Sequence, residues 1–284
     1  MNPELLDTFL DLHESRSFNR SAERLGVSQS TVSARIGALE AALGERLFLR
    51  SRGGTKPTAA GERFASHARG LRHGWAEAKR AVARAGERAG TLRIGLQADL
   101  AGGAIAAWVG AIRAAFPASG LYVEPDFSPQ MAADVLSGEL DLAVLFTPRP
   151  MPDLHYEAVG EARYLMVSTH ARSLAEVDPA RTVRANYAPA FNATHRELYP
   201  ALEAAPVGSG QNAAVAALIV ALGGSGYVLA ETAAELAAAG VARSVAGAEP
   251  IAQPVHALVH IRNRTSALHR RLIGLARRHF SERG

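Results

Sequence analysis

The segment SQSTVSARI, Ser28–Ile36, carries hydroxyl, amide and guanidinium side chains among apolar residues at helical spacing. Glutamine can hydrogen-bond bidentately to adenine, and serine or threonine can bond a base edge or a phosphate. Small side chains in the segment would let a helix sit deep in a major groove, and the amino end of a helix favours a phosphate. The chemistry indicated is therefore recognition of duplex DNA. The candidate residues are Ser28, Gln29, Ser30, Thr31, Ser33 and Arg35.

A basic segment with a Gly-Gly centre, RSRGGTKPT, follows at Arg50–Thr58. A glycine pair between two short runs predicts a tight two-stranded turn, in this setting a wing. Cationic side chains on such a wing would contact phosphates or enter the minor groove. The sequence therefore adds Arg50, Arg52 and Lys56 to the DNA-binding candidates.

Three short helices are predicted to position these side chains. Apolar residues recur at helical spacing over Leu5–Leu12 and predict the first helix. Ser17 and Ser28 are suited to cap the second and third helices. Gly26 and Gly44 are suited to end them. A helix, a glycine-containing turn and a second helix form the helix-turn-helix unit, and an ordinary helical hairpin with a polar face is the competing interpretation.

An unbroken heptad pattern of apolar residues crosses residues 59–89. Its steps alternate between four and three, which is the signature of a coiled coil. Because so narrow a stripe suits one partner helix, we expect a dimer seam, and the alternative is a lone amphipathic helix packed on a domain. The seam consists of Phe64, Ala68, Leu71, Trp75, Ala78 and Val82, and it continues to Ala85.

After Gly90 the pattern changes to strands that alternate with helices. Strands are expected at 91–96, 121–127 and 141–146, with helices near 104–116 and 130–137. This alternation predicts a parallel sheet that helices cover on both faces. Further strands are expected at 163–169, 227–230 and 255–261, and further helices near 212–223, 231–239 and 265–280.

The composition of the 284-residue chain limits its function further. It has no cysteine, which excludes disulfides, thiolate metal sites and thiol nucleophiles. Residues 1–89 hold 15 Lys and Arg against 10 Asp and Glu, a net +5, whereas the remainder holds 16 against 17. Such an asymmetry is typical of a nucleic-acid-binding arm on a neutral body. Without a secretory leader or a run of about 18 apolar residues, we expect a cytoplasmic protein with no membrane span.

We find no catalytic, cofactor or metal motif in the sequence. His256 and His260 share one strand-like run, but no carboxylate or third ligand accompanies them. The glycine-rich stretches at 208–212 and 223–226 lack the strand and helix context of a dinucleotide fold. We therefore expect no cofactor, no metal site and no enzymatic activity.

Residues 1–65 resemble the winged helix-turn-helix domain of the LysR-type transcriptional regulators. The resemblance is carried by the Ser17-Phe18 pair and by the motifs AERL, SQSTVS, LE.ALG..LF.R and T.AG, in that order and without gaps. Looser markers, LRIG and GELDLAV, extend it along the chain. One departure is that the family often has arginine directly after its serine, whereas here Ser33 is followed by Ala34 and then Arg35.

The resemblance implies an α/β protein with an N-terminal winged helix-turn-helix, a long linker helix and a two-lobed effector domain similar to periplasmic solute-binding proteins. Its implied partners are partly palindromic promoter DNA, a small-molecule effector of unknown identity and further copies of the chain, as a dimer or a tetramer; RNA polymerase is an open further partner. The expected domains are 1–58 for DNA binding, 59–89 for dimerisation and 90–284 for the effector, with lobe I at about 91–150 and 250–284 and lobe II at about 155–240.

In that architecture a ligand binds between the lobes, at the carboxyl ends of strands. The family usually offers serine or threonine after the first strand, where a ligand carboxylate sits, whereas this chain has Gln97 and Asp99. Because Asp99 would repel a carboxylate, a simple acid is disfavoured as effector, unless the binding register is shifted. Each candidate could instead be a loop or cap group only. The candidates are Gln97, Ala98, Asp99, Ser128, Phe146, Thr147, Asn192 and Ser209, the last within GSGQN at 208–212.

The leading hypothesis is a sequence-specific transcription regulator, dimeric through the linker helix and controlled by a small molecule. One alternative is a solute-binding or enzymatic domain fused to a DNA anchor, which would turn over its ligand. Another is an architectural DNA-binding protein without an effector, which would show weak sequence preference and no ligand-induced thermal shift.

Overall fold

A computed structural model describes residues 3–51, 54–83, 89–102, 105–126, 128–148 and 150–281. The chain divides into two compact units. Unit 1 comprises Met1–Gly90 together with Ala133–Leu140, and unit 2 comprises Thr91–Ala132 and Asp141–Gly284.

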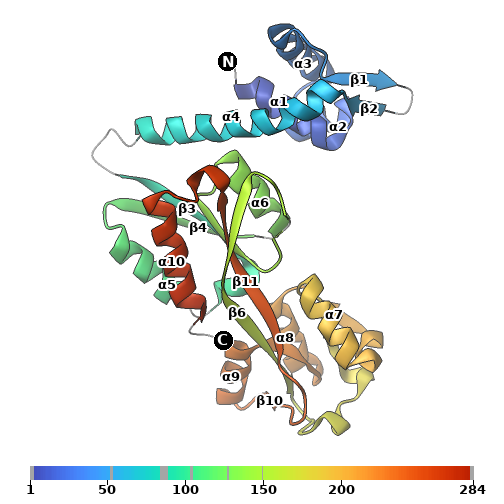
Figure 1. Cartoon of the computed structure of the whole chain (residues 1–284). Coiled ribbons are helices and arrows are strands. Elements are labelled where there is room, and N and C mark those ends of the chain that lie inside the picture. The colour runs from blue at the N-terminus through green and yellow to red at the C-terminus, as the bar shows by residue number, and fades with distance from the viewer. Residues whose placement is uncertain are drawn as a thin grey trace. The chain divides into compact units, whose positions relative to one another are not determined.

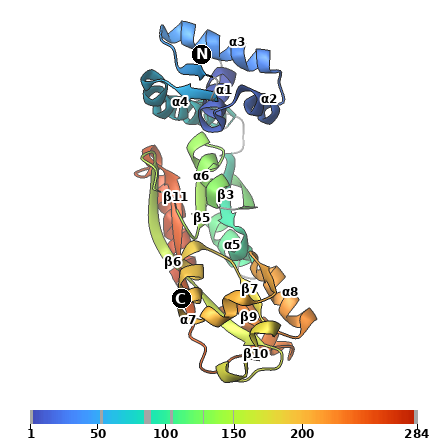
Figure 2. The ribbon, with the colours of Figure 1, turned by 90° about the vertical axis from the view of Figure 1, so that its right-hand side faces the viewer.

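Unit 1 begins with three helices (Figure 2), and their buried side chains form one apolar core. They are α1 (Pro3–Ser15), α2 (Phe18–Leu25) and α3 (Gln29–Leu43). The ring of Phe9 meets those of Phe48 and Phe64 at centroid distances of 5.4 and 5.0 Å. The buried core consists of Leu6, Phe9, Leu12, Phe18, Ala22, Val32, Ile36, Leu39, Leu47, Phe48, Ala65 and Ala68.

The predicted caps and stops of the helix-turn-helix are confirmed. The hydroxyls of Ser17 and Ser28 each accept a hydrogen bond from a backbone amide in the first turn of α2 and α3. Gly26 and Gly44 follow the two helices with φ of 64° and 70°, in the left-handed region that glycine adopts without strain. The turn between α2 and α3 is therefore set by local chemistry.

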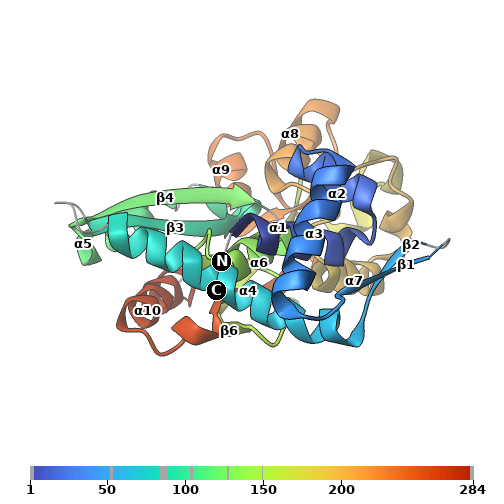
Figure 3. The same cartoon turned by 90° about the horizontal axis from the view of Figure 1, so that it is seen from above.

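A hairpin and a long helix complete the order of elements in unit 1. β1 (Phe48–Ser51) pairs antiparallel with β2 (Gly54–Pro57), as a wing (Figure 3). The carboxylate of Glu40 on α3 holds the start of this hairpin, since its Oε1 accepts the amide hydrogens of Leu47 and Phe48 at 2.7 and 3.1 Å. The long helix is α4 (Ala59–Ala83).

Unit 2 is built on a seven-stranded sheet with the order β10-β6-β11-β5-β3-β4, and β9 also pairs with β6. β3 and β5 are parallel, as expected. The later strands join differently, since β11 runs antiparallel to both β5 and β6. The strands are β3 (Ala89–Gln97), β4 (Ser119–Asp126), β5 (Leu142–Leu145), β6 (Leu154–Ser168), β9 (Ser225–Leu229), β10 (Arg243–Ser244) and β11 (Ile251–His260).

β6 and β11 are longer than the sequence predicts, and they run side by side through the whole of unit 2 (Figure 1). The strand predicted at 163–169 begins at Leu154, and the one predicted at 255–261 begins at Ile251. Gly160 and Pro254 interrupt the strand pattern in these earlier halves. A register shift between Val255 and His256 accommodates the interruption.

The two ends of the β6–β11 ribbon carry different elements, which we name lobe I and lobe II. Lobe I holds β3, β4, β5, η1 (Ala98–Ala101), α5 (Ile105–Ala115) and α10 (Ala267–Ser281), and α6 (Ser128–Ser137) joins β4 to β5. Lobe II holds β7 (Val183–Ala185), α7 (Pro189–Leu198), β8 (Val207–Ser209), α8 (Asn212–Leu222), β9, α9 (Ala230–Ala238) and β10.

The helices predicted in unit 2 are confirmed as α5, α6, α8, α9 and α10. The sequence patterns did not indicate α7, β7, β8 and β10. The three strands have two or three residues each, too few for a periodic pattern, and α7 begins at Pro189 without a side-chain cap.

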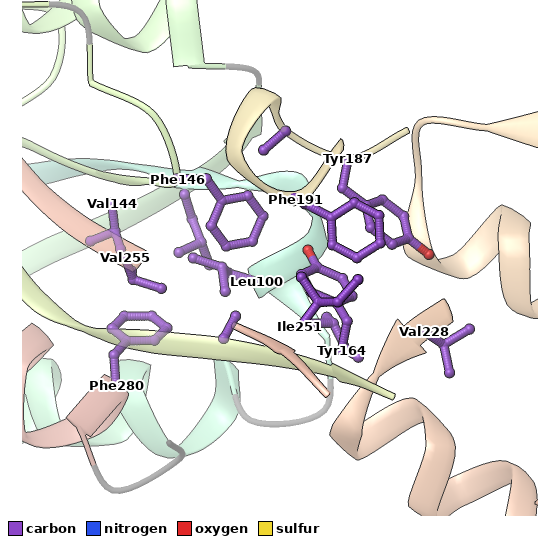
Figure 4. Packing of buried hydrophobic residues seen from close by; sticks show 14 of the residues in the cluster. Leu100, Val144, Phe146, Tyr164, Tyr187, Phe191, Val228, Ile251, Val255 and Phe280 are labelled. Carbon is purple, nitrogen blue, oxygen red and sulfur yellow. The ribbon is translucent and has the colours of Figure 1, made fainter. Parts of the chain in front are cut away.

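One apolar cluster runs through both lobes, and Tyr164 of β6 is one of its buried residues (Figure 4). The Tyr164 ring stacks on Tyr187 at 4.6 Å and meets Phe191 edge-on at 4.8 Å. Phe146 from lobe I packs against the same ring at 6.5 Å. The lobes therefore share a core, and polar groups at their junction are held by packed neighbours.

Candidate functional site

The amino end of α3 presents polar side chains while its other face is buried. Val32, Ile36 and Leu39 lie in the core of unit 1. Gln29 and Ser30 are exposed. The helix is therefore fixed by its apolar face, and its first turn is open to a partner such as a DNA groove.

Hydroxyl groups at the start of α3 bond to one another. Ser28 Oγ lies 2.7 Å from Ser30 Oγ and 2.8 Å from Thr31 Oγ1, and it accepts the Thr31 amide hydrogen. These three hydroxyls form a cap that orders the first turn. Gln29 lies beside the cap, and Ser33 is half-buried one turn further along.

Arg35, expected to contact DNA, turns toward α1. Its Nη2 donates to Glu4 Oε2 at 2.6 Å, and its Nη1 donates to Thr8 Oγ1 at 3.4 Å. The guanidinium is thereby engaged inside unit 1. The geometry favours a role in fixing α3 on α1 over direct readout of a base.

The wing supplies one described cation. Lys56 is exposed on β2. The side chain of Arg50 and the whole of Arg52 lie outside the described residues. Placed on an antiparallel hairpin beside the helix-turn-helix, a lysine can meet a phosphate.

The heptad positions of α4 have two different environments. Ala68 is fully buried in the core of unit 1, and Phe64 packs against the same core. Leu71 and Trp75 are 42 % and 48 % exposed, large values for such apolar residues, and Ala78 is exposed as well. The first two positions thus serve the domain's own packing, and the exposed stripe begins at Leu71. Ala85 and the side chain of Val82 lie outside the described part of the chain.

In unit 2, the first strand of lobe I ends at a buried polar pair. Gln97 is 6 % exposed, and its Oε1 accepts the Ser128 hydroxyl at 2.8 Å. This bond ties the end of β3 to the start of α6. Ala98 follows as a half-buried residue of η1.

Asp99 of lobe I makes a hydrogen bond to lobe II. Its side chain is buried, and its Oδ1 accepts the amide hydrogen of Asn212, the first residue of α8, at 2.8 Å. The Asn212 side chain continues inside lobe II, accepting from the Leu229 amide and donating to Thr232 Oγ1. Burial raises the pKa of the Asp99 carboxyl, and the Asn212 hydrogen bond partly offsets that rise.

Gln253 makes a second bridge between the lobes, which was not among the residues expected from the sequence. It is buried in β11, where its Nε2 donates to the Phe146 carbonyl and its Oε1 accepts from the Phe191 amide, both at 3.3 Å. A single glutamine within an apolar strand gives no local signal of such a role. The bridge brings the end of β5 next to the start of α7.

Two expected effector residues follow the residues that Gln253 joins, since Thr147 comes directly after Phe146 and Asn192 directly after Phe191. Thr147 Oγ1 and Asn192 Oδ1 are buried and have no hydrogen-bond partner among the residues that the structure describes. A buried polar atom left unpaired costs free energy, which a ligand can recover. Phe146 differs from the expectation, since its ring is buried in the apolar cluster.

Ser209 completes the expected set at the end of β8. Its carbonyl accepts from the Asn186 amide, and Asn186 Oδ1 accepts from Asn192 Nδ2. Ser209 and Asn192 are therefore joined through Asn186, on the lobe II side of the junction. The described chain holds no group of three His, Cys, Asp or Glu placed to bind a metal ion, and no described helix combines the length and apolarity needed to cross a bilayer.

Comparison with known proteins agrees with this arrangement. Residues 3–62 match the family model "Bacterial regulatory helix-turn-helix protein, lysR family", and residues 85–281 match "LysR substrate binding domain". HdfR of Salmonella newport, an HTH-type transcriptional regulator, is 33 % identical over 185 residues, which span 64 % of this chain and 66 % of that relative.

Two solved structures show the same fold at low sequence identity. Full-length LysG from Corynebacterium glutamicum with bound effector Arg has a TM-score of 0.59 at 23 % identity and covers 97 % of this chain and 98 % of its own. Full-length CbnR complexed with its target DNA has a TM-score of 0.56 at 19 % identity, with coverage of 98 % and 100 %. Since the two family models together match most of its length, the chain belongs to the LysR family of bacterial helix-turn-helix transcription regulators.

Proposed function

We propose that this protein is a cytoplasmic, sequence-specific DNA-binding regulator whose activity is modulated by a small molecule bound between the lobes of unit 2. Residues 1–58 bind DNA, residues 59–89 dimerise and residues 90–284 hold the effector. HdfR, of which the matched stretch spans 66 % of the length, is likewise a transcriptional regulator.

The observation that carries the DNA-binding role is the exposed first turn of α3 on a helix whose opposite face is locked in the core. Gln29 reads a base edge there, and the capped hydroxyls and Lys56 contact the DNA backbone. The complex of CbnR with its target DNA supports this use of the fold. The proposed DNA contacts are Ser28, Gln29, Ser30, Thr31, Ser33, Arg50, Arg52 and Lys56, with Arg35 in a positioning role.

The exposed stripe of α4 is the proposed dimer contact. Leu71 and Trp75 would be covered by the same residues of a second copy, since a heptad stripe suits one partner helix. Two such copies present two recognition helices, which fits a partly palindromic site. A tetramer, and contact with RNA polymerase, are further proposals that rest on the family alone.

The effector is proposed to bind at the junction of lobe I (about 91–150 and 250–284) and lobe II (about 155–240). The unpaired oxygens of Thr147 and Asn192, together with Asp99, are the groups it would satisfy. LysG, which has Arg as bound effector, supports an effector site in this domain.

The test is selection of bound duplexes from a random-sequence pool with the full-length protein, at near-physiological salt and with excess competitor DNA. We expect enrichment of two related half-sites separated by about one helical turn or a multiple of it. Retention of the pool without enrichment would overturn sequence-specific regulation and favour an architectural DNA-binding protein.

A further inference from the structure

Asp99 is a buried carboxylate that forms no ion pair with any cation in the described part of the chain. It is 9 % exposed, and the Asn212 amide is its one hydrogen-bond donor among the described residues. The second carboxylate oxygen makes no hydrogen bond or ion pair there. A buried carboxyl held by one hydrogen bond is costly to ionise, which is why burial raises its pKa, and a cationic ligand would offset that cost.

The neighbours of Asp99 do not relieve this charge. Tyr164 is within its electrostatic influence, yet the Tyr164 hydroxyl is buried and has no hydrogen-bond partner among the described residues. Arg163 lies close along β6, but its Nη2 is 3.5 Å from Glu161 Oε1. The positive charge near Asp99 is thus paired with a second carboxylate.

Asp99 lines a pocket. Leu100, Leu229 and Phe280 provide its apolar walls, and Glu161 and Glu231 add acidic groups. The lining also holds one arginine, Arg163, which is paired with Glu161. Such a lining suits a ligand with a positively charged end and a short apolar body. Asp99 is nine-tenths buried and is among the residues that line this space, so a ligand in the pocket would lie beside it.

The same geometry excludes an anion at the neighbouring helix end. The amino end of α8 would attract a carboxylate. Asp99 Oδ1 already occupies it at 2.8 Å, as a carboxylate tethered to lobe I. An effector that brought its own carboxylate to this point would meet a fixed negative charge and a filled hydrogen-bond donor.

We propose that Asp99 determines the chemical class of the effector: it selects a small primary amine, whose ammonium group binds the second Asp99 oxygen while its apolar body lies against Leu100, Leu229 and Phe280. The inference rests on the proposed function, because it names the ligand class of that regulatory domain, at a pocket that Asp99 lines and Thr147 and Asn192 do not. Binding of the ammonium neutralises a charge that links lobe I to lobe II, so the ligand stabilises the contact between the lobes.

The experiment compares two ions of similar size and opposite charge on the full-length protein. Thermal unfolding is followed in n-propylammonium chloride, in sodium butyrate and in sodium chloride at equal ionic strength. We expect a saturable rise in Tm with propylammonium alone, of about 2–5 °C at ten times Kd. If the Tm of the wild-type protein does not rise with propylammonium, or rises with butyrate instead, the proposal is overturned.

Two substitutions assign the effect to Asp99. Asp99→Asn keeps an oxygen for the Asn212 amide but removes the charge, and we expect it to abolish the propylammonium response. Asp178→Asn is the matched control, since Asp178 also accepts one backbone amide hydrogen, from Ala180 at 2.9 Å, but is exposed. It should respond as the wild type does. An undiminished response in folded Asp99→Asn, checked by circular dichroism, also overturns the proposal.

Failure of the amine proposal can be distinguished from failure of the proposed function. If half-sites are selected from random DNA but propylammonium gives no shift, the regulator stands and the amine specificity is wrong. If propylammonium binds through Asp99 but no sequence is selected, the amine site stands and sequence-specific regulation is wrong.

Discussion

Arg35 lies on α3 among side chains that face outward, yet its guanidinium bonds to Glu4 and Thr8 of α1. Its type and place in the sequence favoured a DNA contact, and its surroundings favour a positioning role. Gln29 lies on the same turn of α3 as Ser30, and both residues are exposed. We therefore expect substitution of Arg35 to weaken the packing of α3 on α1, and substitution of Gln29 to weaken binding to specific DNA sequences.

We predict that Arg35→Ala and Glu4→Ala are energetically coupled by about 0.5 kcal/mol, because both side chains are partly exposed and solvent screens the pair. A double-mutant cycle in urea unfolding measures the coupling. DNA affinity of Arg35→Ala should fall by a similar factor on all sequences. Zero coupling together with loss at a single base position would restore Arg35 as a base-reading residue.

At the scale of elements, unit 1 depends on a close approach between α4 and the start of β1. A Cβ atom built on Gly61 would lie 2.2 Å from the Leu47 carbonyl oxygen. Neither group can move far, since Gly61 lies in the first turn of α4 and the Leu47 amide is held by Glu40. The wing is therefore placed by α4 as well as by α3.

We predict that Gly61→Ala lowers the free energy of unfolding of unit 1 by about 1–3 kcal/mol through overpacking. Gly74→Ala in the same helix is the matched control, since its Cβ would meet no atom of the described residues within 4 Å. That control should raise stability by about 0.5–1 kcal/mol. Equal effects of the two substitutions, measured by urea unfolding, would contradict the close approach.

The exposed stripe of α4 gives a prediction about assembly. Trp75→Asp should convert the dimer to monomers, because it would bury a charge in each half of the seam. Ser66→Asp, exposed on α4 but off the stripe, should leave the dimer intact. Size-exclusion chromatography with light scattering measures both, and a dimeric Trp75→Asp protein would refute the seam.

The elements that the sequence predicts well are those with local signals. Ser17, Ser28, Gly26 and Gly44 act within a few residues of their own positions, and each caps or ends its helix as expected. The hydrogen bond of Asp99 with Asn212 joins residues that are 113 positions apart in the sequence, and no pattern in either segment predicts it.

Other features were missed for the same reason. Gln253 became a bridge only because β11 carries it between Phe146 and Phe191. Ala68 fits a dimer seam by its spacing, but the fold of unit 1 buries it against α1. Spacing predicts which residues share a face, whereas tertiary packing decides what covers that face.

At the scale of the molecule, unit 2 has one apolar cluster through both lobes, so its stability responds to groups in either lobe. His195 of α7 is buried within the aromatic part of that cluster, beside Phe191 and Tyr227. Burial lowers the pKa of His195 below its ordinary value of 6.5, although Glu203 raises it in part. The folded chain therefore takes up this proton less readily than the unfolded chain.

We predict that unit 2 loses stability as pH falls below about 6.5, because the unfolded state then binds a proton that folded His195 resists. Urea unfolding at pH 7.5 and 5.5 measures the loss, and His195→Gln should reduce it. Part of the loss should remain, because burial also lowers the pKa of His256. An unchanged pH dependence in His195→Gln would exclude His195 as a source.

The central claim is that the protein binds a specific DNA sequence as a dimer and that α3 recognises that sequence. The most direct test is a footprint of the full-length protein on DNA upstream of its own coding region, at near-physiological salt with excess competitor. Gln29→Ala is run beside the wild type, and Gln211→Ala, an exposed amide in unit 2, is the control. We predict a protected site with two-fold symmetry that Gln211→Ala retains, and a loss of about 1–3 kcal/mol in specific affinity with Gln29→Ala while non-specific binding persists. Salt-sensitive binding without any protected sequence, or equal footprints for all three proteins, would contradict the account.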